Sequence, residues 1–282
     1  MFKILKREQY SPVTYMWELE APEIAKAAKP GHFVIIRHGR GGERIPLTIA
    51  DFDRQRGTIT LVIQAVGKTT YALMELKQDE HLDDLVGPLG HARDFGEHKK
   101  IVCVGGGLGV APVFPQLRQY KQMGAHTISI VGFRSKDLMF WVDKFEAQSD
   151  ELLITTDDGS HGIKGFVTTA LKDVIEREGD SIDEVLAIGP AVMMKACVDM
   201  TKPRNIPTVV SLNPIMVDGT GMCGGCRVTV GGKMLFACVD GPEFDGHQVD
   251  FDEMLLRSKR FAGEEQESLE RYRRDHECKI GL

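Results

Sequence analysis

Three of the six cysteines in this 282-residue chain lie close together, at Cys223, Cys226 and Cys238, and Asp218 precedes them. If both sulfur atoms of Cys223-x2-Cys226 are to face one metal centre, the chain must turn tightly. The glycines at 219, 221, 224 and 225 allow that turn and leave backbone N–H groups that can point at sulfur. The spacing Asp218-x4-Cys223-x2-Cys226-x11-Cys238 matches the C-x4-C-x2-C…C pattern of plant-type [2Fe–2S] proteins, with aspartate in place of the first cysteine.

Three interpretations of this loop remain open from the spacing alone. A [2Fe–2S] cluster held by Asp218, Cys223, Cys226 and Cys238 is the one that the spacing favours. A structural zinc site also uses Cys-x2-Cys, but such sites usually add a second cysteine pair or a Cys/His pair, and this loop contains no histidine. The third is a disulfide or no bond at all. A disulfide is disfavoured because the chain begins without a secretory signal, so we expect a cytoplasmic protein.

The composition is that of an ordinary soluble protein with room for two or three domains. Hydrophobic residues make up 42% and charged residues 27% of the chain, and the net charge of −6 does not indicate nucleic-acid binding. No run of 18 apolar residues occurs, so we expect no membrane span. Cys103 and Cys197 lie in apolar segments typical of core residues, whereas Cys278 lies in a polar tail that suggests no role.

Short segments rich in Val, Ile, Thr and aromatic residues fill the first part of the chain. The predicted strands are Phe2–Arg7, Thr14–Ala21, Gly31–His38, Pro46–Phe52 and Gly57–Val66, and a helix is predicted over Thr69–Lys77. Short strands with regular turn signals predict a small antiparallel β-barrel, which we place at residues 1–97.

After Lys99 the pattern changes to alternating strands and helices. Strands are predicted at 100–104, 127–133, 152–156, 184–188 and 208–212, with helices at 109–123, 140–148, 166–178 and 191–200. This alternation predicts a five-stranded parallel α/β domain over residues 98–213. A cluster-binding region at 214–250 and a charged helical extension at 251–282, with helices over 253–261 and 264–275, complete the predicted organisation.

A glycine-rich turn, Val104–Gly109, follows an apolar strand and begins a helix, the setting in which backbone N–H groups bind a phosphate. The dinucleotide fingerprint is incomplete, because Val110 occupies the third glycine position and no acidic residue follows the second strand, where Arg134 stands. A turn that simply starts a helix is the alternative. Other strands also end in polar or turn residues, at Arg134, Asp157 and Gly189, and this favours nucleotide binding at the carboxyl edge of the sheet.

Two barrel segments offer groups that could bind a cofactor. Arg44 stands just before a strand, and Gly67–Thr70 begins a helix with N–H groups, hydroxyls and a cation suited to a pyrophosphate. An ordinary exposed helix start explains the second segment equally well, so both interpretations stay open.

The order of barrel, nucleotide domain and cysteine loop resembles the ferredoxin–NADP reductase superfamily. The resemblance covers residues 1–255 and is carried mainly by Arg44–Asp51, Val104–Pro112 and Ser211–Cys226. Within the superfamily the chain is similar to electron-transfer subunits that bear flavin and an iron–sulfur cluster, most of all to the small subunits of NADH-dependent reduced ferredoxin:NADP oxidoreductases. The corresponding dihydroorotate dehydrogenase subunits are the alternative, and they have cysteine at the position of Asp218.

The resemblance implies three sets of binding residues. FAD would bind at Arg44, Pro46, Leu47, Thr48, Gly67, Lys68, Thr69 and Thr70. NAD(H) would bind at Gly106, Gly107, Gly109, Ala111, Pro112, Arg134, Asp157 and Gly189, and the cluster at Asp218, Cys223, Cys226 and Cys238. Leu47 stands where ferredoxin reductases have a tyrosine, and Arg44 lies one residue farther from Thr48 than in their pattern. No catalytic side chain is implied, because the cofactors carry the chemistry.

The resemblance also implies an activity and partners. The chain would exchange hydride between NAD(H) and FAD, and single electrons between FAD and the cluster, within an electron-bifurcating oxidoreductase. A larger subunit with flavin and [4Fe–4S] clusters would bind NADP(H) and serve ferredoxin. The preference for NAD rests on the resemblance, because Arg134 and the missing acidic residue would favour a 2′-phosphate. A zinc-stabilised nucleotide-binding module is the alternative of another class, but it leaves Arg44–Asp51 unexplained. The charged tail after Asp250 is either a docking element or a solvated helix.

Overall fold

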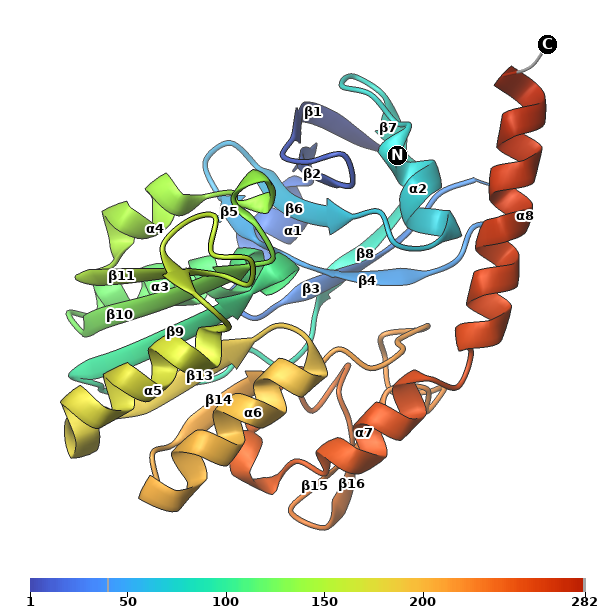
Figure 1. Cartoon of the computed structure of the whole chain (residues 1–282). Helices are drawn as coiled ribbons and strands as arrows, with labels where there is room; N and C mark the ends of the chain where they lie inside the picture. Colours follow the sequence, from blue (N-terminus) through green and yellow to red (C-terminus); the bar gives the residue numbers. More distant parts are fainter. Residues whose placement is uncertain (40, 281–282) are drawn as a thin grey trace.

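The computed structural model describes residues 1–39 and 41–280, with side chains as far as Asp275. Figure 1 shows a β-barrel in blue and cyan, an α/β domain in green and yellow, and a C-terminal region in orange and red. The three parts follow one another along the chain, in the predicted order. Cys278 lies outside the residues whose side chains are described.

The N-terminal barrel consists of two antiparallel sheets, with strand orders β5-β6-β2-β1-β7 and β4-β3-β8. Its elements are β1 (Phe2–Gln9), β2 (Thr14–Glu20), α1 (Pro22–Ala27), β3 (Phe33–Arg37), β4 (Ile45–Thr48), β5 (Asp51–Asp53), β6 (Thr58–Gln64), α2 (Lys68–Met74), β7 (His81–Leu82) and β8 (Asp84–Leu89). The barrel is confirmed, but its last two strands, β7 and β8, were not predicted, and two further differences concern β4, β5 and α1. The predicted strand 46–52 is divided at the buried pair Ile49 and Ala50 into β4 and β5, which pair in different sheets. The short helix α1, with Pro22 in its first turn, has too few residues to show a helical pattern in the sequence.

The α/β domain is built on one sheet with the order β12-β11-β10-β9-β13-β14-β17. Its strands are β9 (Lys100–Gly106), β10 (His126–Phe133), β11 (Glu151–Thr156), β12 (Ile163–Lys164), β13 (Glu184–Ile188), β14 (Thr208–Ser211) and β17 (Glu243–Asp245). The five predicted strands are present and parallel. The sheet has two further edge strands: β12, which is parallel to β11, and β17, which is antiparallel to β14. Strands of two and three residues carry too little pattern to be predicted.

Helices cover both faces of this sheet (Figure 1). They are α3 (Val110–Gln122), α4 (Val142–Gln148), α5 (Val167–Glu178) and α6 (Ala191–Thr201), close to the predicted ranges. Apolar side chains of α3 and α4 belong to one buried cluster, and those of α5 and α6 belong to another on the opposite face. Because both faces are covered, the exposed edge formed by the carboxyl ends of the strands is the place left for ligands.

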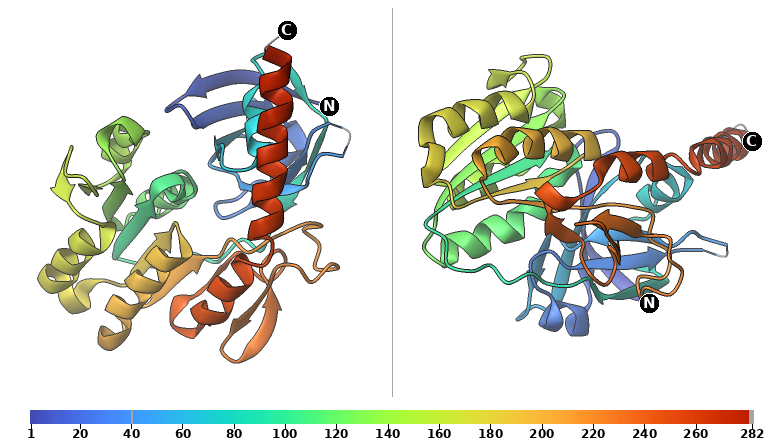
Figure 2. Two further views of the ribbon diagram at one scale, coloured as in Figure 1. Left: turned by 45° about the vertical axis from the view of Figure 1, so that its right-hand side comes forward. Right: turned by 90° about the horizontal axis from the view of Figure 1, so that it is seen from below.

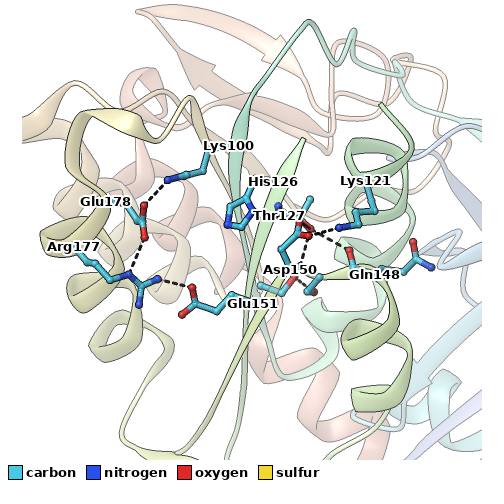
Figure 3. Close-up of polar contacts among 11 residues, drawn as sticks. Lys100, Lys121, His126, Thr127, Gln148, Asp150, Glu151, Arg177 and Glu178 are labelled. Atoms are coloured by element: carbon cyan, nitrogen blue, oxygen red, sulfur yellow. Dashed lines mark hydrogen bonds and ion pairs between the residues drawn. The ribbon is translucent and has the colours of Figure 1, made fainter. Parts of the chain in front are cut away.

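Charged side chains hold together the opposite, amino edge of the sheet (Figure 3). The Asp150 carboxylate accepts hydrogen bonds from Lys121 Nζ at 2.5 Å and from the Thr127 backbone N–H at 2.8 Å. The Lys121 ammonium and the Thr127 donors lower the pKa of Asp150 to about 2. Lys100 and Arg177 both pair with Glu178, at 2.5 and 2.8 Å. These pairs are remote from the carboxyl edge and therefore serve the fold.

The barrel and the α/β domain also contact each other directly. Trp141 Nε1 donates a hydrogen bond to the Tyr10 hydroxyl at 2.7 Å, and the Tyr10 ring stacks on Phe140 with 5.3 Å between centroids. Arg118 of α3 pairs with Asp51 of β5 at 2.7 Å. These contacts border a polar cleft of 1070 Å³ between the barrel, α3 and α4. None of the predicted site residues lines that cleft.

The C-terminal region packs against the two preceding domains. It contains the hairpin β15 (Arg227–Val230) and β16 (Lys233–Phe236), the strand β17, and the helices α7 (Phe251–Ser258) and α8 (Ala262–Ile280). Figures 1 and 2 show α8 running along the outside of the barrel beside α2. The Tyr272 hydroxyl bonds the Glu75 carboxylate, and the Arg273 guanidinium lies 5.4 Å from the centre of the Tyr71 ring. In the described part of the chain, every helix is too short or too polar to cross a membrane.

Candidate cofactor and cluster site

A cavity of 650 Å³ lies between the barrel and the carboxyl edge of the α/β sheet. It brings together ten of the residues that the sequence singled out: Pro46, Leu47, Thr48, Gly106, Gly107, Gly109, Ala111, Pro112, Arg134 and Gly189. The barrel contributes one wall through β4, and the glycine-rich turn contributes the other. The volume is in the range of small-molecule and cofactor sites, which is roughly 300–1,000 Å³.

The glycine-rich turn packs closely against the end of β13, and this explains its unusual sequence. A Cβ atom at Gly109 would lie 2.2 Å from the Ile188 carbonyl oxygen, so only glycine fits there. A Cβ at Gly105 would lie 2.9 Å from the Cα of Val110. In a dinucleotide fingerprint the third glycine allows the helix to approach the strand closely. Here Gly105 of β9 allows that approach, so Val110, at the third glycine position, can be a buried core residue.

The remaining predicted nucleotide and flavin residues lie outside the cavity lining. Asp157 follows β11, and its N–H donates to the Phe133 carbonyl at 3.1 Å. Gly67, Lys68, Thr69 and Thr70 begin α2 beyond Val66, which does line the cavity. The Thr70 hydroxyl oxygen accepts hydrogen bonds from the N–H groups of Val66 and Gly67 at 2.9 and 3.0 Å. Thr70 therefore caps its own helix, while the Thr69 hydroxyl donates to Glu43.

Several cavity residues were missed from the sequence. They include Phe133, Phe140, Asn213 and Met216. Asn213 follows β14, so the rule that strand ends form the ligand crevice could have found it. No sequence signal marks Phe140, because it enters the cavity only through the packing of its loop against the barrel residue Tyr10.

The Asp218 carboxylate organises the cysteine loop. It accepts hydrogen bonds from the backbone N–H groups of Thr220, Met222 and Cys223 at 3.1, 2.9 and 2.8 Å. Desolvation acts in the opposite direction, but these donors hold the pKa of Asp218 below its ordinary value. Gly219 has φ +77°, a left-handed conformation that lets the chain curl around the carboxylate.

The three cysteines of the loop lie in two environments. Cys226 and Cys238 are buried, each 1% exposed, and burial together with the neighbouring Cys226 raises the pKa of Cys238 to about 12. Cys223 is exposed, and its sulfur accepts the Gly225 N–H at 3.5 Å. Within the described residues, no three His, Cys, Asp or Glu side chains already form a metal-binding group. The donor set nevertheless fits a [2Fe–2S] cluster, because three thiols and a carboxylate share one region and backbone N–H groups point at the Cys223 sulfur and at the Asp218 carboxylate.

The cysteine loop rests on the barrel. A Cβ at Gly219 would lie 2.6 Å from Leu89 Cδ1 and 2.7 Å from Ile35 Cδ1, so the loop backbone lies directly on barrel side chains. Arg44 Nε donates to the Val217 carbonyl at 2.7 Å. Arg44, which the resemblance assigned to the flavin, thus contacts the cluster loop here, and its contact with a flavin stays a prediction.

Comparison with known proteins shows the family to which the chain belongs. The model of the iron–sulfur cluster binding domain of dihydroorotate dehydrogenase B matches residues 213–250. A Thermotoga maritima protein, named as a homologue of the electron transfer subunit of dihydroorotate dehydrogenase B (NAD(+)), is 44% identical over 270 residues, which span 96% of this chain and 95% of that protein. The chain belongs to the family of the dihydroorotate dehydrogenase B electron transfer subunits and their homologues. A Fusobacterium nucleatum member of this family is 31% identical over 86% of this chain and 95% of its own.

Solved structures agree with this family and with the predicted fold. A structure of the NADH-dependent reduced ferredoxin–NADP oxidoreductase, from work on flavin-based electron bifurcation, contains a chain that is 43% identical with a TM-score of 0.91. The match covers 96% of this chain and 98% of that one. Phthalate dioxygenase reductase is 17% identical with a TM-score of 0.61, over 81% of this chain and 85% of its own, and so shares the fold alone. The resemblance inferred from the sequence is confirmed.

Proposed function

We propose that this chain is the electron-transfer subunit of an electron-bifurcating, NADH-dependent ferredoxin:NADP oxidoreductase. The observation that carries the proposal is the 650 Å³ cavity, in which the barrel strand β4 faces the glycine-rich turn of the α/β domain. This arrangement suits a flavin and a nicotinamide held face to face, with the cysteine loop on the same barrel. The 43% identity to the ferredoxin–NADP oxidoreductase chain over almost the whole length supports the bifurcating type.

The residues of the chain divide among three ligands. FAD is assigned to Pro46, Leu47 and Thr48 with the start of α2 at Gly67, Lys68, Thr69 and Thr70. NAD(H) is assigned to Gly106, Gly107, Gly109, Ala111 and Pro112 of the glycine-rich turn and to the strand ends at Arg134, Asp157 and Gly189. The cluster is assigned to Asp218, Cys223, Cys226 and Cys238. When bound, FAD supplies hydride acceptance from NADH and one-electron transfer to the cluster. The protein binds and orients these groups, and the apolar side chains of Phe33, Leu47 and Phe140 line the cavity that would hold them.

The electron-transfer partner is proposed to be a larger subunit that carries flavin and [4Fe–4S] clusters, binds NADP(H) and serves ferredoxin. Apolar side chains are exposed in the cysteine loop, Val217 by 46% and Met222 by 88%, and in the helical region that follows it, Leu256 by 74% and Phe261 by 44%. Exposed apolar groups beside a redox centre are typical of an interaction surface. We assign this face to the larger subunit. A separate experiment tests whether α8 also docks that subunit: residues 262–282 are deleted and complex formation is measured.

The electron-transfer subunit of dihydroorotate dehydrogenase is the second candidate. The family model at residues 213–250 and the names of several relatives at 31–36% identity favour it. The aspartate at position 218 favours the first candidate, because the dihydroorotate dehydrogenase subunits are expected to have a cysteine there. Reconstituting the chain with each candidate larger subunit separates the two functions. Only the matching larger subunit should form a stable complex in which electrons from NADH pass through this chain to that subunit.

The first experiment is an anaerobic visible spectrum of the purified chain, with iron, zinc, sulfide and flavin measured on the same sample. We expect about two irons, two sulfides and one FAD per chain, with the colour bleached by NADH. One zinc in a colourless protein would contradict the proposal and favour a nucleotide-binding module.

A further inference from the structure

We propose that Arg44 is a positioning residue that fixes the cysteine loop on the barrel, and that its guanidinium charge raises the reduction potential of the cluster bound there. The first part concerns only contacts within this chain. The second part rests on the proposed function, because it requires the [2Fe–2S] cluster.

The hydrogen bonds of Arg44 join parts of the chain that are 173 residues apart. Nε donates to the Val217 carbonyl at 2.7 Å, and Nη2 lies 3.4 Å from the Asp218 carbonyl. Arg44 immediately precedes β4, whose residues Pro46 and Leu47 line the flavin cavity. The same side chain thus connects the flavin-facing strand with the backbone of the proposed aspartate ligand.

The shape of the guanidinium suits this role. Its N–H donors have a fixed planar arrangement, so two neighbouring carbonyls can be held in one geometry, which a lysine ammonium cannot do. The Asp218 carboxylate accepts hydrogen bonds from backbone N–H groups farther along the turn, while the Arg44 guanidinium donates to the carbonyls of Val217 and Asp218. Gly219 packs on Ile35 and Leu89 between these contacts. Three kinds of contact therefore fix the start of the loop.

A second arginine contacts the other end of the loop more weakly. Arg257 of α7 places Nη2 3.4 Å from the Gly225 carbonyl. Arg44 makes the shorter bond, and of the two arginines only Arg44 belongs to the barrel. We therefore infer that Arg44 determines where the loop lies relative to the flavin cavity.

The charge has a consequence for electron transfer. Reduction adds one negative charge to a cluster, so a nearby cation that is partly shielded from water stabilises the reduced form. Removing the Arg44 charge should lower the equilibrium constant for reduction about tenfold, which corresponds to a potential lower by 59 mV for one electron.

Amide hydrogen exchange tests the positioning role in the full chain. In Arg44→Met, peptides covering residues 213–226 should exchange about tenfold faster or more, as expected from losing a hydrogen bond to a charged group. Arg44→Lys should give a smaller increase. Arg37→Met is the matched control, because Arg37 is an exposed barrel arginine that pairs with Asp84, and it should leave the loop unchanged. This readout does not need the cluster, so failure of the inference is distinguishable from failure of the proposed function.

Redox titration followed by EPR tests the electrostatic role. Arg44→Met should lower the potential, and Arg44→Lys should keep it near the wild-type value. Unchanged loop exchange in Arg44→Met would overturn the positioning role, and an unchanged potential would overturn the electrostatic role. Loss of FAD binding with an unchanged loop would instead make Arg44 a flavin ligand.

Discussion

Glu243 of β17 provides a pH-dependent test of how the domains pack. Its side chain is 3% exposed, and Oε1 accepts a hydrogen bond from Gln116 Nε2 at 2.5 Å. Oε2 is buried without a hydrogen-bond partner among the described residues. Arg93 Nε is 4.0 Å from Glu243, whereas Arg93 Nη2 bonds Glu184 at 2.6 Å. Burial raises the pKa of Glu243 to about 7, although the Arg93 charge and the Gln116 hydrogen bond act in the opposite direction.

The magnitude follows from the change in pKa between the unfolded and folded states. A rise from 4.5 to about 7 corresponds to about 3 kcal/mol. The folded state favours the protonated acid, so this contribution to stability is fully present below pH 4.5. It is lost as the pH rises through about 7. The amide in Glu243→Gln cannot ionise, so this variant should be more stable than the wild type at pH 8.5 by about 2 kcal/mol or more. At pH 5 the advantage should be largely absent.

Urea unfolding at pH 5, 7 and 8.5, followed by tryptophan fluorescence, measures the difference. Glu184→Gln is the matched control, because Glu184 forms the close pair with Arg93 and also accepts the Tyr120 hydroxyl at 2.5 Å. Removing it should destabilise the protein by about 3 kcal/mol or more at every pH. If Glu243→Gln is destabilised equally at pH 5 and pH 8.5, then Glu243 is a paired carboxylate and the reasoning is wrong.

Three further predictions concern the site and the fold. Gly109→Ala should abolish flavin reduction by NADH in stopped-flow assays while flavin absorbance is retained, because its Cβ would lie 2.2 Å from the Ile188 carbonyl oxygen. Gly263→Ala in α8 is the control, because its Cβ would have no atom within 4 Å and the residue lies outside the proposed binding sites. Asp218→Cys should keep the cluster but change its EPR spectrum and potential, since a thiolate donates more electron density than a carboxylate, and an unchanged spectrum would remove Asp218 from the ligands. Asp150→Asn should lower the free energy of unfolding by about 1 kcal/mol at pH 7. Because the pKa of Asp150 is lowered to about 2, that difference should vanish in melting experiments as the pH falls from about 4 to about 2.

Much of the architecture was predictable because it depends on local patterns. The five central strands of the α/β sheet are apolar runs separated by helical segments, and parallel pairing follows from that order. The glycine-rich turn and the cysteine spacing are also local, so their residues could be named from the sequence. The edge strand β17 could not be predicted, because three residues after the cysteine loop join the sheet only through long-range pairing with β14.

The sequence by itself determined which chemical groups are present and in what order: a barrel, a glycine-rich turn before a helix, and three thiols with a carboxylate at ferredoxin-like spacing. These are properties of neighbouring residues, and backbone geometry at short range restricts them strongly. Only the tertiary structure decided that Phe140 and Asn213 enter the cavity, that Arg44 contacts the cysteine loop, and that Glu243 shares Arg93 with Glu184. Each of these contacts joins segments far apart in the chain. Their geometry depends on how whole domains pack, which no local pattern encodes.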